Sequence, residues 1–340
     1  MPELAILDSL NVDVLTDNVS DNYVSKTLFA VSEFENVILG GASIISGEAL
    51  LCANLGFGLR LVSQIGDTRH TLLFDTGPEG AIFIRNCGNL GISLGDVEAI
   101  AVSHGHWDHM AALPATIDAI AKQGGRVTVH VNPGMFNERG IRLSSGRVVP
   151  VAKVPPPEEL ERHGATVVNN HEARLLPDSH FYYSGEIPRV TAFEKGRNDH
   201  LCRSSPDASW QPDPLLMDER MLVARVRGLG LVIFSACSHA GIVNVCTHAG
   251  IVNVCTHARN LFPEIPMHAV IGGLHLGGVM ERLIPDTVEG LRPFNISHII
   301  TGHCTGWRAL HALADAFGDA VSQSAVGTTY RFGAAGHRSG

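Results

Sequence analysis

Residues Ser103 to His109 read SHGHWDH and so carry three histidines and one aspartate directly after an apolar segment. That segment, Val97 to Val102, is typical of a buried strand, which would end where the cluster begins. Imidazole suits zinc and its first-row neighbours, and an added carboxylate permits a second ion with positions open to water. We therefore expect a metal site, which favours hydrolytic chemistry. The alternative is a set of ordinary surface histidines on a loop between a strand and a helix.

The spacing within the cluster predicts two pairs of ligands. If the strand ends at Ser103, His104 and His106 project to the same side of an extended turn, because side chains alternate along it. These two histidines can then share one ion. Asp108 and His109 would open a helix that continues to Ile120, and from its first turn they can serve a second ion.

Three further histidines each follow a predicted strand in the second half of the chain: His239, His275 and His303. Small residues surround each of them and let the backbone approach an ion closely. Strand ends meet at one edge of a sheet, where α/β proteins assemble their sites. Asp75 also follows an apolar run, and we expect its carboxylate to fix the tautomer of a ligand imidazole. The alternative is that each histidine is isolated and simply hydrogen-bonded.

Composition narrows the class of protein. The net charge of −9 disfavours a chain whose main task is to grip nucleic acid. No apolar run is long enough to span a bilayer, and no basic segment precedes an apolar one at the start, so we expect no membrane association and no signal peptide. Seven cysteines without CxxC spacing indicate reduced thiols and a cytoplasmic protein. Cys237 and Cys304 adjoin predicted ligands and are either small buried side chains or thiolate ligands.

Strand-like and helix-like segments alternate over the first third of the chain, which predicts an α/β fold. The 340 residues are expected to form a single domain. Residues 132–218 are less regular and rich in proline and glycine, and we interpret them as an inserted cap on the substrate side. Met221 to Ala236 then predicts a hairpin, and two further strands follow at His268 to Ile271 and His298 to Thr301.

These motifs together resemble those of the metallo-β-lactamase-fold hydrolase superfamily. Within it, the chain is similar to the subgroup of 7,8-dihydropterin-6-methyl-4-(β-D-ribofuranosyl)aminobenzene-5'-phosphate synthase. The resemblance covers most of the chain and is carried by six motifs: Leu73-Phe74-Asp75-Thr76-Gly77, the Ser103 to His109 cluster, Ser184-Gly185-Glu186-Ile187-Pro188-Arg189, Cys237-Ser238-His239-Ala240-Gly241, Gly272-Gly273-Leu274-His275-Leu276 and Gly302-His303-Cys304-Thr305-Gly306.

The resemblance implies a four-layer αβ/βα sandwich with two divalent metal ions at its edge, zinc first, with manganese or iron as alternatives. His104, His106 and His239 would hold one ion, and Asp108, His109 and His303 the other. His275 stands where many members have a bridging aspartate, and a neutral imidazole cannot bridge two ions. Asn54-Leu55-Gly56 stands where the family often has a His-Gly pair.

Nine residues from His239 to Thr247 are repeated without change as His248 to Thr256, and His257 begins a third copy that diverges. If the duplicated segment is helical, it adds about two and a half turns; otherwise it forms a bulged loop. We expect His239 to be the ligand, because the strand before it must deliver it. His248 and His257 would then be solvent-exposed copies.

The function that we expect is a metal-dependent hydrolase, with Asp108 as its catalytic residue. It would act on a small ester-type metabolite, which can carry a phosphate, through a metal-bound hydroxide. Arg189, Lys195 or Arg197 could contact that phosphate. Two alternatives remain open: a pseudoenzyme that binds metal and ligand but is impaired by the duplication, and a di-iron redox protein on the same fold. The only partner that we expect is a small-molecule substrate.

Overall fold

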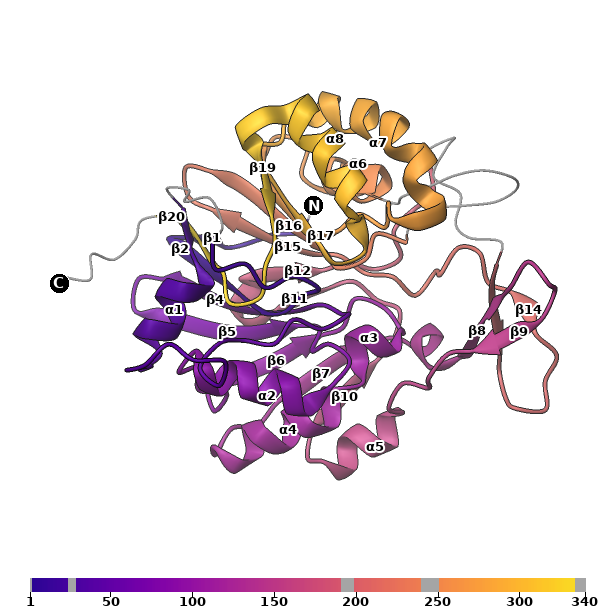
Figure 1. The fold of residues 1–340 in the computed structure, drawn as a ribbon, viewed down its shortest axis with the longest axis horizontal. Coiled ribbons are helices and arrows are strands. Elements are labelled where there is room, and N and C mark those ends of the chain that lie inside the picture. Colours follow the sequence, from indigo (N-terminus) through magenta and orange to yellow (C-terminus); the bar gives the residue numbers. More distant parts are fainter. Residues whose placement is uncertain (1, 24–28, 191–198, 240–250, 334–340) are drawn as a thin grey trace.

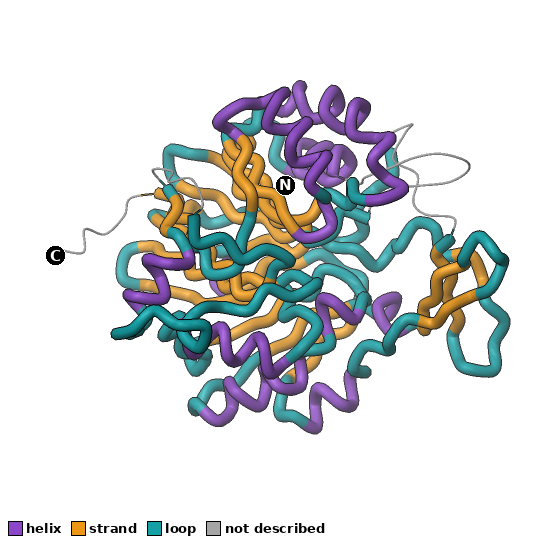
Figure 2. The backbone as a smooth tube through the Cα atoms, viewed as in Figure 1, coloured by secondary structure: helices purple, strands orange, loops and turns teal. Residues whose placement is uncertain are grey.

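The computed structural model describes residues 2–23, 29–190, 199–239 and 251–333. Within them, two large sheets face each other, helices cover the outer face of each, and a small third sheet lies to one side (Figures 1 and 2). The predicted four-layer αβ/βα sandwich is therefore confirmed.

The first large sheet holds most of the second half of the chain. In sheet order its strands are β11 (Arg174–Leu176), β12 (Phe181–Tyr183), β15 (Leu222–Val226), β16 (Gly230–Ser235), β17 (Met267–Gly273), β18 (His298–Gly302) and β19 (Val321–Gln323), with β1 (Ile6–Leu7) beside β15. The strands from β16 to β19 are parallel. β15 and β16 form the predicted hairpin.

The second large sheet holds most of the first half. In sheet order its strands are β10 (Thr166–Asn169), β7 (Thr128–Val131), β6 (Val97–Ala101), β5 (Thr68–Phe74), β4 (Gly58–Ile65), β2 (Ser9–Thr16), β20 (Thr329–Gly333) and β3 (Ala30–Val31). β5, β6 and β7 are parallel, so their carboxyl ends reach the same edge.

Strands that are buried on both faces explain the layering. Along β16, Leu231 and Ile233 pack among the helices of the outer layer, while Val232 and Phe234 face the other sheet. Because side chains alternate along a strand, such an uninterrupted apolar run can serve two cores at once. Phe74 of β5 meets Phe234 across the space between the sheets, with ring centroids 6.2 Å apart.

Three helices cover the first sheet and the remaining helices lie with the second sheet or at its edge (Figure 1). Those on the first sheet are α6 (Ile251–Leu261), α7 (Ile284–Leu291) and α8 (Trp307–Phe317). The others are α1 (Glu33–Leu39), α2 (Gly80–Asn89), α3 (Trp107–Met110), α4 (Leu113–Lys122) and α5 (Pro157–Arg162).

The helix predicted from Asp108 to Ile120 is wrong as a single element. It is divided into α3 and α4, with Ala111 and Ala112 between them. Pro114 lies in the first turn of α4, where its missing N–H group would be unpaired in any case, whereas inside a continuous helix it would remove a hydrogen bond. This proline is the signal that separates the two helices.

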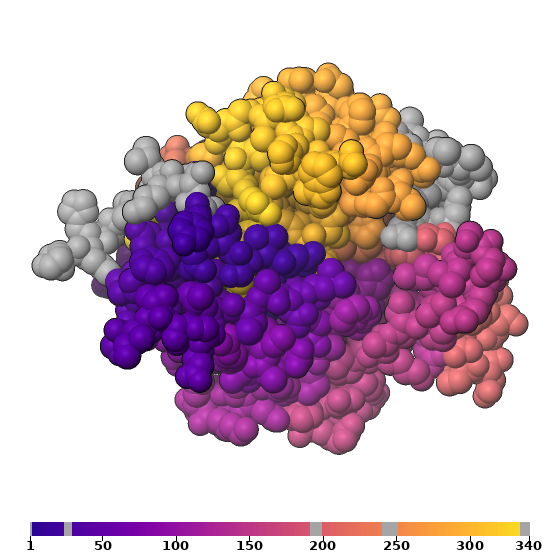
Figure 3. All heavy atoms as spheres, in the orientation of Figure 1, coloured from indigo at the N-terminus to yellow at the C-terminus, as the bar shows by residue number. Residues whose placement is uncertain are grey.

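Residues 132–218 do not form one separate unit. β10 extends the second sheet, and β11 and β12 extend the first, so these parts belong to the sandwich. The small third sheet takes the rest, in the order β14 (Gln211–Pro212), β13 (His200–Arg203), β8 (Glu138–Arg142) and β9 (Val148–Pro150). Figure 3 shows this part of the chain as a projection at one side of the molecule. That it acts as a cap toward substrate stays a prediction.

Three smaller expectations can also be compared with the structure. No helix in the described ranges is both long enough and apolar enough to cross a bilayer. The six cysteines described have free thiols. His257 was expected to be exposed but lies half-buried in α6, and His248 falls outside the described residues, as does most of the duplication.

The contact between the sheets predicts a stability effect. Phe234→Ala should lower the free energy of unfolding by about 3–5 kcal/mol, because it removes a fully buried ring and leaves a cavity. Denaturant unfolding followed by circular dichroism measures the change. Val279→Ala, at a side chain that is 67% exposed, is the control and should change stability by less than about 0.5 kcal/mol. Equal effects of the two substitutions would contradict this account of the core.

Candidate metal centre

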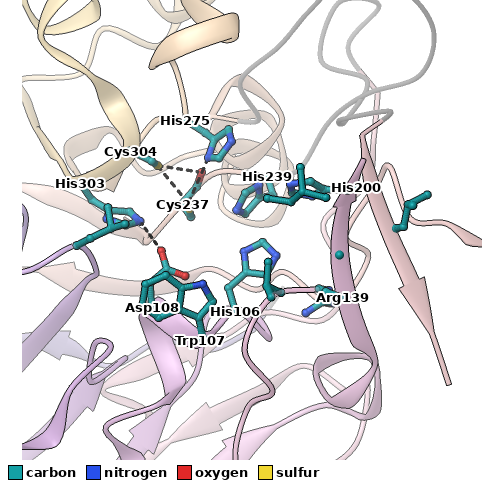
Figure 4. A pocket seen from close by; sticks show the side chains of 15 residues that line it. His106, Trp107, Asp108, Arg139, His200, Cys237, His239, His275, His303 and Cys304 are labelled. Atoms are coloured by element: carbon teal, nitrogen blue, oxygen red, sulfur yellow. Dashed lines mark hydrogen bonds and ion pairs between the residues drawn. The ribbon is translucent and has the colours of Figure 1, made fainter. Parts of the chain in front are cut away.

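The predicted site residues come together where parallel strands of both large sheets end. β5 leads to Asp75 and β6 leads to His104, while β16, β17 and β18 lead to His239, His275 and His303. Figure 4 shows His239, His275 and His303 opposite His106 and Asp108 around one space. The site is thus built from both halves of the sandwich.

Among the described residues, potential ligand atoms form five groups whose members lie within 4.8 Å of one another, and two of these groups consist of predicted ligands alone. The first is His104, His106 and His239, and the second is Asp108, His109 and His303. In the second group, Oδ2 of Asp108 lies 3.7 Å from Nε2 of His109 and 3.6 Å from Nε2 of His303. Ligand atoms about 2.1 Å from a tetrahedral zinc ion are about 3.4 Å apart, so this spacing fits an ion.

Three buried ring nitrogens in these groups have no hydrogen-bond partner among the described residues. They are Nε2 of His109, His239 and His303. A buried polar atom without a partner costs free energy, and native proteins rarely keep several of them side by side. A cation in the first group would satisfy His239 and a second cation would satisfy His109 and His303, so the residues present fit metal ions.

Asp75 sets the tautomers of two histidines. Its Oδ2 accepts a hydrogen bond from Nδ1 of His109 at 2.7 Å and one from the hydroxyl of Ser103 at 2.6 Å. Because Ser103 donates to Asp75, its oxygen accepts from Nδ1 of His104 at 2.9 Å. Both imidazoles therefore carry their proton on Nδ1 and present a lone pair on Nε2, which in His104 lies 2.9 Å from Nδ1 of His106.

His303 is oriented by two residues that sequence reasoning missed. Oδ1 of Asp17 accepts from the backbone N–H of His303 at 2.9 Å. Asn18 donates to the carbonyl of His303 at 2.9 Å, and its Oδ1 lies 3.2 Å from Nδ1 of the same ring. Since that oxygen can only accept, His303 also presents Nε2 as a lone pair. Asp17 and Asn18 directly follow β2, the same signal that identified Asp75.

The loop between His104 and His106 is held by a buried ion pair. Asp218 accepts from the backbone N–H of Gly105 at 2.8 Å and pairs with Arg139 at 2.7 Å, and Arg139 donates in turn to the carbonyl of Gly105. A Cβ at Gly105 would lie 2.1 Å from the carbonyl oxygen of Met135, so only glycine fits here. Asp218 lies in an irregular stretch that gave no sequence signal.

Most of the site histidines are favoured in their neutral form. The negative charges of Asp108 and Asp75 favour positive charge at His109. Burial, followed by the charges of neighbouring imidazoles, lowers the pKa of four histidines well below its ordinary value: His104, His106, His239 and His303. Arg139 contributes to the lowered pKa of His104 and His106. Burial alone would lower the pKa of His109, but Asp108 and Asp75 outweigh it and raise that pKa. Neutral imidazole is the form that binds metal.

Four site residues adopt left-handed backbone conformations, with φ between +46° and +58°: Asp75, Ser238, His275 and His303. Each costs on the order of 1–3 kcal/mol unless its surroundings impose it, and such strain gathers at functional sites. Here the strain lies at the strand ends, where the chain must turn a side chain toward the site.

Cys237, His275 and Cys304 lie beside the two ligand groups. Sγ of Cys237 is 3.4 Å from Nδ1 of His275 and 3.1 Å from Sγ of Cys304 (Figure 4). Burial and the neighbouring Cys304 raise the pKa of the Cys237 thiol well above its ordinary value. His275 was nominated as a ligand, yet it belongs to neither of the two groups above and instead groups with Cys237 and His239.

Four of the six residues of the two ligand groups, His106, Asp108, His239 and His303, line a cavity of about 300 Å³ whose other walls are mostly apolar. These walls are Leu55, Trp107, Ile141, Val151 and Leu201. β8 and β13 of the small sheet supply part of them, and His200 of β13 adds an imidazole whose ring lies 5.6 Å from that of His106. Sequence reasoning missed His200 because its strand joins the site only through tertiary packing.

Arg189, one of the basic residues expected to meet a phosphate, is not among the residues that line the cavity. Arg189 donates to the backbone carbonyls of Ile187, Leu215 and Leu216, so its guanidinium is already used and that expectation is wrong. Lys195 and Arg197 lie outside the described residues.

Comparisons with known proteins agree with this geometry. Residues 56–185 match the model of the metallo-beta-lactamase superfamily. Over these residues the chain is similar to that superfamily. The crystal structure of Tm1679, a metal-dependent hydrolase of the β-lactamase superfamily, superposes with a TM-score of 0.66 over 96% of this chain and 99% of that one. Its sequence identity is 19%, so this likeness concerns the fold.

Two relatives from Methanocaldococcus jannaschii match most of this chain. One is 7,8-dihydropterin-6-methyl-4-(beta-D-ribofuranosyl)-aminobenzene-5'-phosphate synthase, 24% identical over 280 residues, which are 82% of this chain and 90% of the relative. The other is the uncharacterized protein MJ0448, 25% identical over 259 residues, or 76% and 87% of the two chains. The resemblance to the synthase subgroup is therefore confirmed. A metallo-β-lactamase fold implies the binding of divalent metal.

The Asp75 network predicts a loss of metal affinity. Asp75→Asn should weaken metal binding by about 10–100-fold, because the amide no longer fixes both tautomers. Competition with a chromophoric chelator measures the affinity. Asp13→Asn is a matched control, since Asp13 is a buried carboxylate of the same sheet that pairs with Arg60 and Thr329 instead of the site. An equal loss in both variants would assign the effect to general destabilisation.

Proposed function

We propose that this protein is a hydrolase that uses two divalent ions, zinc first, on a small ester-type metabolite. His104, His106 and His239 would hold one ion, and Asp108, His109 and His303 the other. The observation that carries the proposal is the set of three buried Nε2 atoms without a partner among the described residues, in two adjacent groups of potential ligands. The family match over residues 56–185 supports the general activity, and the assignment of ligands and metal is ours.

When bound, such ions lower the pKa of a coordinated water and polarise the bond that it attacks. Three residues of the protein would orient the water, fix the ligand rings and supply a proton. Asp108 directs Oδ2 toward His109 and His303, which leaves Oδ1 to accept a hydrogen bond from the attacking water. Asp75 stays hydrogen-bonded to Ser103 and His109 and keeps both rings fixed. His200 stands near His106 and His239, where it could donate a proton to the leaving group.

The cavity limits the substrate to a small molecule with an apolar part. Its volume of about 300 Å³ is at the lower end for ligand pockets. Leu55, Ile141 and Val151 exclude water from one side, which strengthens every charge interaction within. A phosphate on the substrate is supported by the relative whose name describes a phosphate-bearing product. That relative is a synthase, so the substrate panel should also include its product.

Removal of metal and of a ligand tests this proposal. Zinc-loaded protein should hydrolyse at least one member of a panel of phosphodiesters, lactones and thioesters, and a chelator should abolish the activity until zinc or manganese is restored. His106→Ala should lower kcat/KM by more than about 100-fold, since changes to supporting residues alone cost 10–100-fold. His171→Ala, at an exposed histidine, is the control and should keep the activity.

If the loaded protein turns over no panel member and His106→Ala binds metal like the wild type, the proposal fails. Iron content together with a visible spectrum of the purified protein would instead support the di-iron alternative.

The duplication provides a second test. Removing His239 to Thr247 or His248 to Thr256 produces the same shorter chain, because the copies are identical. Since His239 already lies against His104 and His275 in the full-length protein, we expect comparable activity with and without the extra copy. Steady-state kinetics on both chains measures this. Activity only in the shorter chain would identify the full-length protein as the impaired pseudoenzyme.

A further inference from the structure

We infer that the sulfur of Cys237 is a ligand shared by both proposed ions. The inference rests on the proposed metal centre and assigns a bridging group that the six ligands above leave out. It also accounts for the chain's departure at His275, where a bridging carboxylate was expected.

The position of Cys237 carries the inference. Its Sγ lies within 4.8 Å of ligand atoms of His104 and His109, one from each ligand group. It forms a second such cluster with His239 and His275, and a third with His303 and Cys304. Among the described residues no other side chain takes part in more than two of these clusters. The sulfur therefore lies between the two groups.

Chemistry favours sulfur over imidazole for this place. A thiolate has several lone pairs and can bind two cations at once, whereas a neutral imidazole offers a single lone pair, on its unprotonated nitrogen. Two divalent ions bring four positive charges, and among the six ligands only Asp108 opposes them. A thiolate adds a second negative charge and is a ligand that zinc accepts readily. On binding, the S–H bond breaks, the proton passes to solvent, and sulfur–metal bonds form.

The backbone holds Cys237 firmly in this place. Ser238 donates to the carbonyl of Gly273 at 2.7 Å, and the N–H of Gly273 donates to the carbonyl of Ala236 at 3.0 Å. A Cβ at Gly273 would lie 2.6 Å from Sγ of Cys304, so glycine is needed where β17 passes the two sulfurs. His275 contacts the Cys237 sulfur through Nδ1 and can orient it without bridging.

Cobalt substitution tests the inference without relying on turnover. The full-length protein, kept reduced with a phosphine so that Cys237 and Cys304 cannot form a disulfide, is titrated with Co²⁺. We expect a sulfur-to-cobalt charge-transfer band in the near ultraviolet that grows with both equivalents, together with visible ligand-field bands. In Cys237→Ser and Cys237→Ala the charge-transfer band should vanish while the ligand-field bands remain. The second cobalt should bind at least about 10-fold more weakly.

Two cysteine variants serve as matched controls. Cys304→Ser removes the sulfur 3.1 Å away, and Cys87→Ser removes a buried thiol in the core beside α2 and α4; both should keep the band. Melting curves establish that each variant is folded. Loss of the band in Cys304→Ser alone, or ligand-field bands without a charge-transfer band in the wild type, would overturn the inference but leave the metal centre intact. Failure of the wild type to bind cobalt would refute the proposed function itself.

Discussion

Burying several imidazoles at one point without enough hydrogen-bond partners is the constraint on which the rest of this structure depends. Each unpartnered nitrogen costs free energy, and protonating the rings would place like charges side by side. A cation relieves both problems. Each proposed ion also joins the two halves of the sandwich, because His239 and His303 come from the first sheet while His104 and His109 come from the second. Metal binding and the packing of the sheets should therefore stabilise one another.

The surrounding hydrogen bonds make the centre rigid before any ion arrives. Asp75 holds one side, Asp17 and Asn18 hold His303, and Glu219 accepts from the backbone N–H of His239 at 2.7 Å. Three of these four residues carry carboxylates, which also lower the cost of gathering positive charge. A site held in this way needs little rearrangement when it binds metal, and this preorganisation is what allows charge stabilisation to act in a reaction.

The sequence was most informative where local pattern and tertiary position coincide. Apolar runs that end in histidine or aspartate predicted β5, β6, β16, β17 and β18 together with the residues at their ends, because parallel strands must deliver their carboxyl ends to one edge. It was least informative where contact depends on packing between distant segments. Asp218 and His200 come from irregular or peripheral segments, and only the folded chain brings them to the loop at Gly105 and to the cavity. The expected phosphate contact at Arg189 was wrong for the same reason, since nearby carbonyls occupy its guanidinium.

The place of the duplication explains why His239 remains in the centre. The path from β16 to His239 comprises only Ala236, Cys237 and Ser238, and all of them precede the repeated residues. The hydroxyls of Ser235 and Ser238 are hydrogen-bonded at 2.9 Å, and Ser238 also donates to the carbonyl of Gly273 at the end of β17. The sheet itself therefore fixes the backbone that leads to His239. The repeated residues follow this histidine and do not enter the approach. Because the strand end holds the ligand from its N-terminal side, we expect an insertion on the other side to leave His239 in place.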